Sequence, residues 1–253
     1  MKIATIVPTK YLYLVQNDSY HLCLAQMIGE DEKYTDFYAS QIKQGRFVIL
    51  DNGQAEGFSP EIVELYEKAK LIGATEIQLP DRFFEAEDTV RASYKAMEYL
   101  WGRWDGEIMA VPQGRDLKEW AECARALLEL PITSLGIPKN LVHTLGPYGR
   151  IKAILKLQQL SDPVNVGLHL LGCWEDPREI GYIHRLTEVG GLTSIRGVDS
   201  GIASIYAAEG RLLDPKKYPK PSKKVRFEYT DMNESLLEHN IKRWRAYCYD
   251  ALC

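Results

Sequence analysis

The chain of 253 residues contains no apolar run long enough to cross a bilayer. A membrane-spanning helix needs about 20 consecutive, mostly apolar residues. The N-terminus shows no leader pattern either, since Met1-Lys-Ile3 leads directly into a strand-like segment that ends at Pro8. We therefore expect neither a membrane helix nor a signal peptide, and we expect a protein of the cytoplasm with no membrane partner.

Cysteine is sparse and poorly placed for binding a metal. The spacing of the five cysteines matches no metal-ligand motif and suggests a reducing compartment; they are Cys23, Cys123, Cys173, Cys248 and Cys253. No histidine–cysteine cluster is present to hold a metal. No serine–histidine pair stands at the spacing of a hydrolase nucleophile elbow. The sequence therefore predicts chemistry that depends on neither a bound metal nor a serine nucleophile.

Charge is low overall and unevenly distributed. A formal net charge of −4 gives no reason by itself to expect a nucleic-acid partner. Between residues 211 and 226, however, one acid, Asp214, stands among the basic residues Arg211, Lys216, Lys217, Lys220, Lys223, Lys224 and Arg226. Three prolines keep this basic loop extended. Charge alone fits two readings equally: a loop that contacts nucleic-acid phosphates, or a solvated loop.

Strand-like and helix-like segments alternate along the chain with short connections. The predicted strands are Ile3–Pro8, Arg46–Leu50, Thr75–Leu79, Glu107–Val111, Ile132–Leu135, Val164–Leu171, Thr193–Val198 and Val225–Tyr229. Amphipathic segments follow the first strand at about 19–28 and 34–43, and a last helix is expected at about 234–249. Eight such strands in about 250 residues predict one α/β domain over 1–253, a closed (β/α)8 TIM barrel. An open doubly wound sheet fits the sequence less well, because such a sheet usually has a glycine-rich nucleotide turn after its first strand, and Pro8-Thr-Lys10 stands there instead.

Polar residues and glycines stand near the C-terminal ends of most predicted strands. They are Asp51, Asp81, Gln113, Gly136, His169, Gly172 and Asp199. Taken singly, each is more often a cap or a turn residue, and the ordinary role of an aspartate such as Asp199 at a strand–helix junction is to cap the helix. In a barrel, however, all strand ends converge on the face where active sites are built. We therefore predict a site for a small polar ligand on this face.

The chemistry of these residues can be narrowed. Two or three carboxylates without a metal suit the chemistry of a glycosidic bond, in which one attacks the anomeric carbon and another moves protons. Gln113 offers donors and acceptors, and a glycine such as Gly136 lets a flat ligand approach the backbone. Carboxylate and amide groups together would read the edge of guanine. Asn52 is placed either to orient Asp51 or to turn the chain, and His169 is predicted to be a satisfied histidine of the barrel interior.

Five short blocks resemble, in order, the signature blocks of the tRNA-guanine transglycosylases. The blocks are Asp51-Asn-Gly-Gln54, Ala110-Val-Pro-Gln-Gly114, Leu135-Gly-Ile-Pro138, Leu168-His-Leu-Leu-Gly172 and Gly197-Val-Asp-Ser200. The resemblance runs from about Arg46 to Leu213 and is greatest to the shorter phage and bacterial members that act on DNA, the DpdA type. It implies a barrel enzyme that exchanges guanine in a polynucleotide for a free 7-deazaguanine such as preQ0, with this base as co-substrate and no cofactor.

The same resemblance assigns roles to individual residues. Asp199 matches the nucleophile that bonds covalently to C1′ of ribose or deoxyribose, and Asp51 matches the second, proton-handling carboxylate. The remaining positions concern the base. Asp81 matches the family's base-recognising aspartate. Gln113 and the Gly136 backbone match the groups that bind the base carbonyl. Gly172 lies in the block near the 7-substituent.

Two departures from the family bear on the substrate. The Pro-Thr-Arg motif that follows the family's nucleophile is replaced by Ala203-Ser-Ile205, although Glu209-Gly-Arg-Leu-Leu213 resembles the next block. The tRNA enzymes also carry a C-terminal zinc site of three cysteines and a histidine. Cys248, Cys253 and His239 are too few and wrongly spaced to form it. We therefore expect DNA rather than tRNA as the polynucleotide, and a barrel without the zinc subdomain.

The basic loop then becomes the expected contact to the DNA backbone, through Arg211, Lys216, Lys217, Lys220, Lys223 and Lys224. The target guanosine must leave the base stack, or lie in unpaired DNA, to reach a pocket at the barrel mouth. The expected location is the cytoplasm of a bacterium or of a phage-infected host. Three other readings stay open: a tRNA enzyme of queuosine or archaeosine type, a barrel that binds nucleic acid without catalysis, and an unrelated barrel glycosidase or sugar-phosphate enzyme. The oligomeric state is also left open.

Overall fold

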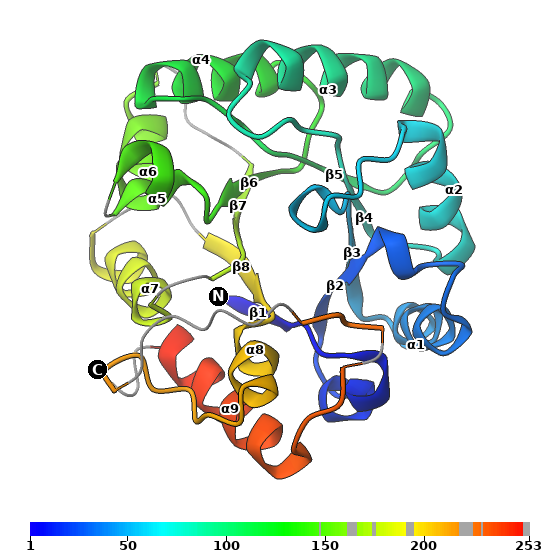
Figure 1. Cartoon of the computed structure of the whole chain (residues 1–253). Helices are drawn as coiled ribbons and strands as arrows, with labels where there is room; N and C mark the ends of the chain where they lie inside the picture. Colours follow the sequence, from blue (N-terminus) through cyan, green and yellow to red (C-terminus); the bar gives the residue numbers. More distant parts are fainter. Residues whose placement is uncertain are drawn as a thin grey trace.

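A ring of parallel strands forms the centre of the molecule, and helices surround it (Figure 1). The computed structural model describes residues 1–146, 148–160, 166–173, 176–190, 195–217, 225–228 and 230–249. The strands are β1 (Lys2–Thr5), β2 (Tyr20–Leu24), β3 (Phe47–Asp51), β4 (Glu76–Gln78), β5 (Glu107–Ala110), β6 (Ser134–Pro138), β7 (Gly167–Leu171) and β8 (Ile195–Ser200).

Helices follow the strands along the chain. The α-helices are α1 (Glu32–Lys43), α2 (Ile62–Ile72), α3 (Ala86–Leu100), α4 (Leu117–Leu127), α5 (Leu141–Leu145), α6 (Gly149–Gln158), α7 (Arg178–Gly190), α8 (Ile202–Ala208) and α9 (Glu234–Cys248). Short 3-10 turns are η1 (Thr9–Val15), η2 (Ala25–Met27) and η3 (Gln54–Glu56). Side-chain caps start several helices, as where Asp116 Oδ1 accepts from Glu119 N at 2.9 Å. Within the described ranges, no helix has both the length and the apolar character needed to traverse a bilayer.

The sheet returns on itself. Its strands are hydrogen-bonded in the order β1-β8-β7-β6-β5-β4-β3-β2, all parallel, and the two outer strands, β1 and β2, also contact each other. The register aligns Asp51 of β3 with Leu24 of β2, and Asp199 of β8 with Ala4 of β1. Because every strand runs in the same direction, their C-terminal ends form one mouth. The predicted TIM barrel is confirmed.

The number of predicted strands is right, but one prediction is wrong and one strand was missed. Residues 225–228 form a turn, in which Phe227 O accepts from Thr9 N at 3.1 Å and Arg226 O accepts from Thr230 N at 3.0 Å; Tyr229 lies outside the described residues. The strand that completes the ring is β2, inside the amphipathic segment 19–28. All five of its residues are buried, so no alternation of polar and apolar side chains marks it as a strand.

A charged layer fills the N-terminal end of the barrel, opposite the mouth. The Arg196 guanidinium on β8 donates to Glu76 on β4 at 2.5 and 2.9 Å and to Glu107 on β5 at 3.2 Å. Ser134 on β6 donates to Glu76 at 2.6 Å. Glu76 has no exposed surface, and a buried carboxylate is tolerated only when it is paired and hydrogen-bonded. The layer therefore links four strands beneath the site described below.

This layer gives a stability prediction. We expect Arg196→Ala to lower the free energy of unfolding by about 3–5 kcal/mol, because it leaves the buried Glu76 carboxylate without its cation. Urea unfolding monitored by circular dichroism measures the change. Lys242→Ala, which removes one partner of the exposed Lys242–Glu238 pair, is the control and should leave the midpoint where it is. An Arg196→Ala midpoint equal to that of the wild type would contradict the assignment.

Candidate active site at the mouth of the barrel

Four polar residues singled out in the sequence end up buried at the mouth. Asp51 is the last residue of β3, and Asp199 is the last but one of β8. Asp81 and Gln113 lie three residues beyond β4 and β5, respectively. The exposed fraction is 9% for Asp51, 6% for Asp199, and 1% for both Asp81 and Gln113. The mouth therefore holds three carboxyl groups and a carboxamide that bulk water reaches poorly.

The carboxyl groups of Asp51 and Asp199 lie close enough to interact although they are far apart in the sequence. Burial raises the pKa of Asp51 well above its usual value, and nearby carboxyl groups add to the rise in the order Glu56, Asp199 and Asp81. A hydrogen bond from the Gly53 backbone opposes it. Crowded carboxyl groups do not all ionise together. Asp51 is therefore the member of the cluster best suited to keep a proton near neutral pH.

Glu56 is a further carboxyl group of the mouth that we did not predict. It lies on η3, a turn bounded by Gly53 and Gly57, both with a positive φ. Figure 1 shows this turn, directly after β3, projecting over the middle of the ring. Glu56 is open to the solvent of the mouth, yet the surrounding walls raise its pKa by burial, with Asp199 adding to the rise and Lys139 opposing it. The sequence signal that could have revealed Glu56 is the pair of glycines, Gly53 and Gly57, on either side of it.

Asp81 is held by two side-chain amides. Asn52 Nδ2 donates to Asp81 Oδ1 at 2.7 Å, and Gln113 Nε2 donates to Asp81 Oδ2 at 2.6 Å. Burial raises the pKa of Asp81 to about 6, and these two hydrogen bonds limit the rise. Asn52 also turns the chain, since its Oδ1 accepts from Gln54 N at 3.0 Å. Of the two roles considered for Asn52, the turn is therefore present, and the carboxylate it contacts is Asp81 rather than Asp51.

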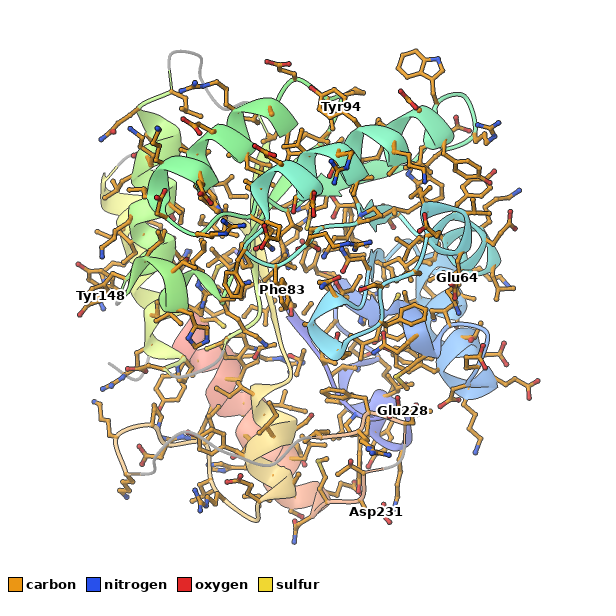
Figure 2. The ribbon with its side chains drawn as sticks, turned by 45° about the horizontal axis from the view of Figure 1, so that its top comes forward. Glu64, Phe83, Tyr94, Tyr148, Glu228 and Asp231 are labelled. Carbon is orange, nitrogen blue, oxygen red and sulfur yellow. The ribbon has the colours of Figure 1, made fainter. Side chains whose placement is uncertain are left out.

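An aromatic pair borders the Asp81–Gln113 contact. Phe84 has a φ of 66°, a left-handed conformation that is strained for a bulky residue. Its backbone N–H points to Gln113 Oε1 at 3.4 Å. The ring of Phe83 lies 6.1 Å from that of Phe84, and Figure 2 shows Phe83 near the middle of the molecule while Tyr148 lies at the edge. An aromatic pair thus follows Asp81 closely in the chain and reaches Gln113 through the Phe84 backbone, which the sequence pattern did not reveal.

One oxygen of Asp199 lies within hydrogen-bond distance of two groups. His169 Nε2 lies 3.0 Å from Asp199 Oδ1, and Gly172 N donates to the same atom at 3.1 Å. His169 has no exposed surface. Gly172 has a φ of +69°, and a Cβ there would lie 2.7 Å from Lys139 Cδ. In the structure, Gly172 thus contacts the predicted nucleophile, and its predicted place near the 7-substituent of a base stays a prediction.

Gly136 lies within β6, two residues before its end. A Cβ at this position would lie 2.5 Å from Leu171 Cδ1 and 3.1 Å from the Met109 sulfur. The missing side chain therefore makes room for neighbouring strands' side chains inside the barrel. The role of its backbone in binding a base carbonyl stays a prediction.

The N-terminal part of the basic loop lies against α9. Asn240, in the middle of α9, donates to Arg211 O at 2.9 Å, and Arg243 donates to Leu213 O at 2.9 Å. Lys216 and Lys217 are exposed. Lys220, Lys223 and Lys224 lie outside the described residues. The structure therefore does not bring Arg211, Lys216 and Lys217 together with the carboxyl groups.

The described residues contain no group of three or more His, Cys, Asp or Glu side chains arranged to hold a metal ion. The residues weighed against a zinc site also have different surroundings, because Cys248 is buried in the core and His239 is exposed. Burial raises the pKa of the Cys248 thiol well above its usual value, which opposes the thiolate form that zinc requires. Cys253 lies outside the described residues.

Comparison with known proteins supports the fold alone. No family model and no curated protein sequence matches the chain. Among solved structures, the chain is similar to the phosphoribosyl anthranilate isomerase from Thermococcus kodakaraensis, with a TM-score of 0.52 and 14% sequence identity over 95% of this chain and 97% of that chain. A likeness at this identity defines a shared TIM-barrel architecture and leaves the chemistry to the site.

The crowding of the mouth can be tested directly. We expect Glu56→Gln to lower the pKa of Asp51, because it removes the neighbouring negative charge that contributes most to the rise. Titration of aspartate carboxyl carbons by 13C NMR measures the shift. Glu64→Gln, on the outer helix α2, is the matched control and should leave the Asp51 titration unchanged. Identical titrations in Glu56→Gln and the wild type would mean that Glu56 lies away from Asp51 in solution.

Proposed function

We propose that this protein is a base-exchange transglycosylase, a pentosyltransferase that replaces guanine in DNA with a 7-deazaguanine of the preQ0 kind through a covalent aspartyl-deoxyribose intermediate. The observation that carries the proposal is the convergence of Asp51 and Asp199, from β3 and β8, at the mouth of the barrel beside Asp81. This convergence is what the resemblance to the guanine transglycosylases requires, and the sequence alone did not ensure it.

Asp199 acts as the nucleophile. One of its carboxylate oxygens attacks C1′ of the target nucleotide while the C1′–N9 bond breaks, and the bonding pair leaves with guanine through an oxocarbenium-like state. The hydrogen bonds from His169 and Gly172 hold the carboxylate in place. The ester bond between Asp199 and C1′ then keeps the sugar on the enzyme while the bases exchange.

Asp51 moves the proton. Because its pKa is raised by burial and by its neighbours, it can carry a proton to the departing guanine, whose ring nitrogen gains the electron pair of the broken bond. The resulting Asp51 carboxylate then accepts the N9 proton of the incoming deazaguanine. The N9 atom of that base attacks C1′, and the C1′–O bond to Asp199 breaks. The cycle thus restores both carboxyl groups to their starting protonation states.

Asp81 and Gln113 supply the recognition of the base. An ionised Asp81 has lone pairs available beyond the two that its amide partners occupy, and these suit the N–H groups of the guanine edge. Gln113 Oε1 makes only long contacts, 3.4 Å to Phe84 N and 3.5 Å to Asn140 Nδ2. Gln113 Oε1 can therefore accept from a ligand while Nε2 keeps its hydrogen bond to Asp81, and Phe83 and Phe84 offer flat faces for stacking.

DNA is the favoured polynucleotide because the resemblance is greatest to the shorter family members that act on DNA. The exchange is measured by incubating the protein with radiolabelled guanine or preQ0 and either DNA or tRNA, and counting the label in the polymer. Label in DNA supports the proposal. Label in tRNA alone would replace it with the queuosine- or archaeosine-type activity, and label in neither would favour a barrel that only binds.

The nucleophile assignment gives a first mutational prediction. Asp199→Ala should lower the exchange rate by at least about 10³-fold, since no other group replaces the attacking oxygen. It should also abolish the covalent protein–DNA complex seen on a denaturing gel, while DNA binding by gel shift stays measurable. Asp105→Asn, an exposed acid before β5, is the control with wild-type exchange. Near-normal turnover by Asp199→Ala would refute the assignment.

The base-recognition assignment predicts a pH dependence. The value of kcat/KM for guanine uptake should rise with pH through about 6, because Asp81 accepts the N–H groups of guanine only after losing its proton. Asp81→Asn should remove this rise and lower kcat/KM by at least about tenfold, because an amide in its place carries a donor toward the donors of guanine. Measurement of kcat/KM from about pH 5 to 8 tests this pH dependence. An unchanged profile in Asp81→Asn would exclude Asp81 as the group that recognises the base.

A further inference from the structure

Three polar residues from three strands form a continuous buried chain inside the barrel. The Tyr20 hydroxyl, from the start of β2, lies 2.8 Å from His169 Nδ1 on β7. His169 Nε2 lies 3.0 Å from Asp199 Oδ1 on β8. Exposed fractions are 1% for Tyr20, 0% for His169 and 6% for Asp199. A chain of this kind that ends on the proposed nucleophile suggests a part in the reaction beyond packing.

A glycine makes this chain possible. A Cβ at Gly197 would lie 2.6 Å from Tyr20 Cε1 and 2.9 Å from the Tyr20 hydroxyl, so any other residue would push the ring away. Gly197 also stands opposite His169 in the β7–β8 register. On its other side, the Tyr20 ring stacks on Phe47 with centroids 5.3 Å apart. The ring is thus clamped in the one position from which its hydroxyl reaches the histidine.

The direction of the two hydrogen bonds follows from the surroundings of Tyr20. Burial raises the pKa of the Tyr20 hydroxyl above its usual value, with the nearby Glu76 and Asp199 carboxyl groups adding to the rise and Arg196 opposing it. Lys2 Nζ also lies 5.6 Å from the Tyr20 ring. Because burial is the largest of these effects, Tyr20 keeps its proton and can donate it to His169 Nδ1. The neutral imidazole then carries its hydrogen on Nε2 and donates it to Asp199.

We propose that Tyr20 and His169 form a positioning relay that fixes Asp199 for attack, with Oδ1 occupied by donors and Oδ2 left as the oxygen that bonds to C1′. Gly172 N completes the pair of donors on Oδ1. The inference rests on the proposed function for the attack itself, whereas the relay is a property of the folded protein. His169 does not touch the substrate in this scheme and exchanges no proton with it. It acts only by holding one carboxylate oxygen.

The relay is tested first without any substrate. The chain contains five histidines, so 15N NMR of protein labelled with [15N]histidine resolves the tautomer of each, and His169→Gln identifies the resonances of His169. We expect His169 to carry its hydrogen on Nε2 and none on Nδ1. A hydrogen on Nδ1 with a bare Nε2 would overturn the proposal.

Tyr20→Phe then removes only the hydroxyl and keeps the clamped ring. We expect the 15N resonance of His169 Nδ1 to shift in this variant, because Nδ1 loses the hydroxyl that donates to it. The rate of covalent-complex formation should fall about tenfold at neutral pH, with less than about a twofold change in KM for DNA, because orientation rather than binding is lost. Wild-type 15N shifts together with wild-type rates in Tyr20→Phe would contradict the relay.

Tyr66→Phe is the matched control. It removes another buried hydroxyl, which donates to Arg103 O at 3.2 Å, and it should keep wild-type rates and histidine spectra. If the wild-type protein exchanges no base, the proposed function fails while the tautomer of His169 still decides the relay. If it does exchange base and Tyr20→Phe matches Tyr66→Phe in every readout, the relay alone fails.

Discussion

The structure depends on one electrostatic constraint: the carboxyl groups of Asp51, Asp81 and Asp199 are buried at the mouth, and the exposed Glu56 lies close enough to add to the repulsion on Asp51. Burial and mutual repulsion both oppose ionisation there. The surroundings of each carboxyl group compensate for this electrostatic cost in a different way. Asp81 accepts from two amides, Asp199 has a histidine and a backbone N–H beside it, and Asp51 has a raised pKa. Equal residue types thus acquire unequal proton affinities, which is the condition for dividing acid, base and nucleophile roles among them.

The barrel interior beneath the mouth is layered to support this arrangement. Arg196, Glu76 and Glu107 form a charged layer at the N-terminal end, which keeps the arginine away from the carboxyl groups above. Tyr20 and His169 cross the middle layer and connect with Asp199. Because parallel strands fix the height of each side chain, a polar residue at the centre of a strand lies beneath the site and one at the end lies in it. This regular spacing explains how residues far apart in the sequence reach the same cavity.

Much of the site could be predicted because apolar strands that stop at a polar residue are recognisable. Asp51, Asp81, Gln113 and Asp199 were found in this way. Tyr20 was missed because β2 is buried along its whole length and shows no alternation. The segment 225–229 resembled a strand, since Val225, Phe227 and Tyr229 alternate with polar residues, yet the described residues 225–228 form a turn that bonds to Thr9 at the start of η1. Glu56 and Phe84 act through turn conformation, which a hydrophobic pattern does not encode.

The sequence by itself determined the fold class and the residue types at the strand ends, because both follow from short-range patterns: runs of apolar residues, helix caps and glycine turns. Only the tertiary structure decided which acids face one another, that Asn52 contacts Asp81, and that Gly197 admits the Tyr20 ring toward His169. It also placed Arg211 and Leu213, at the start of the basic loop, against α9. These are consequences of strand register and ring closure, which bring together residues from opposite ends of the chain, and proton affinity depends on that proximity rather than on residue type.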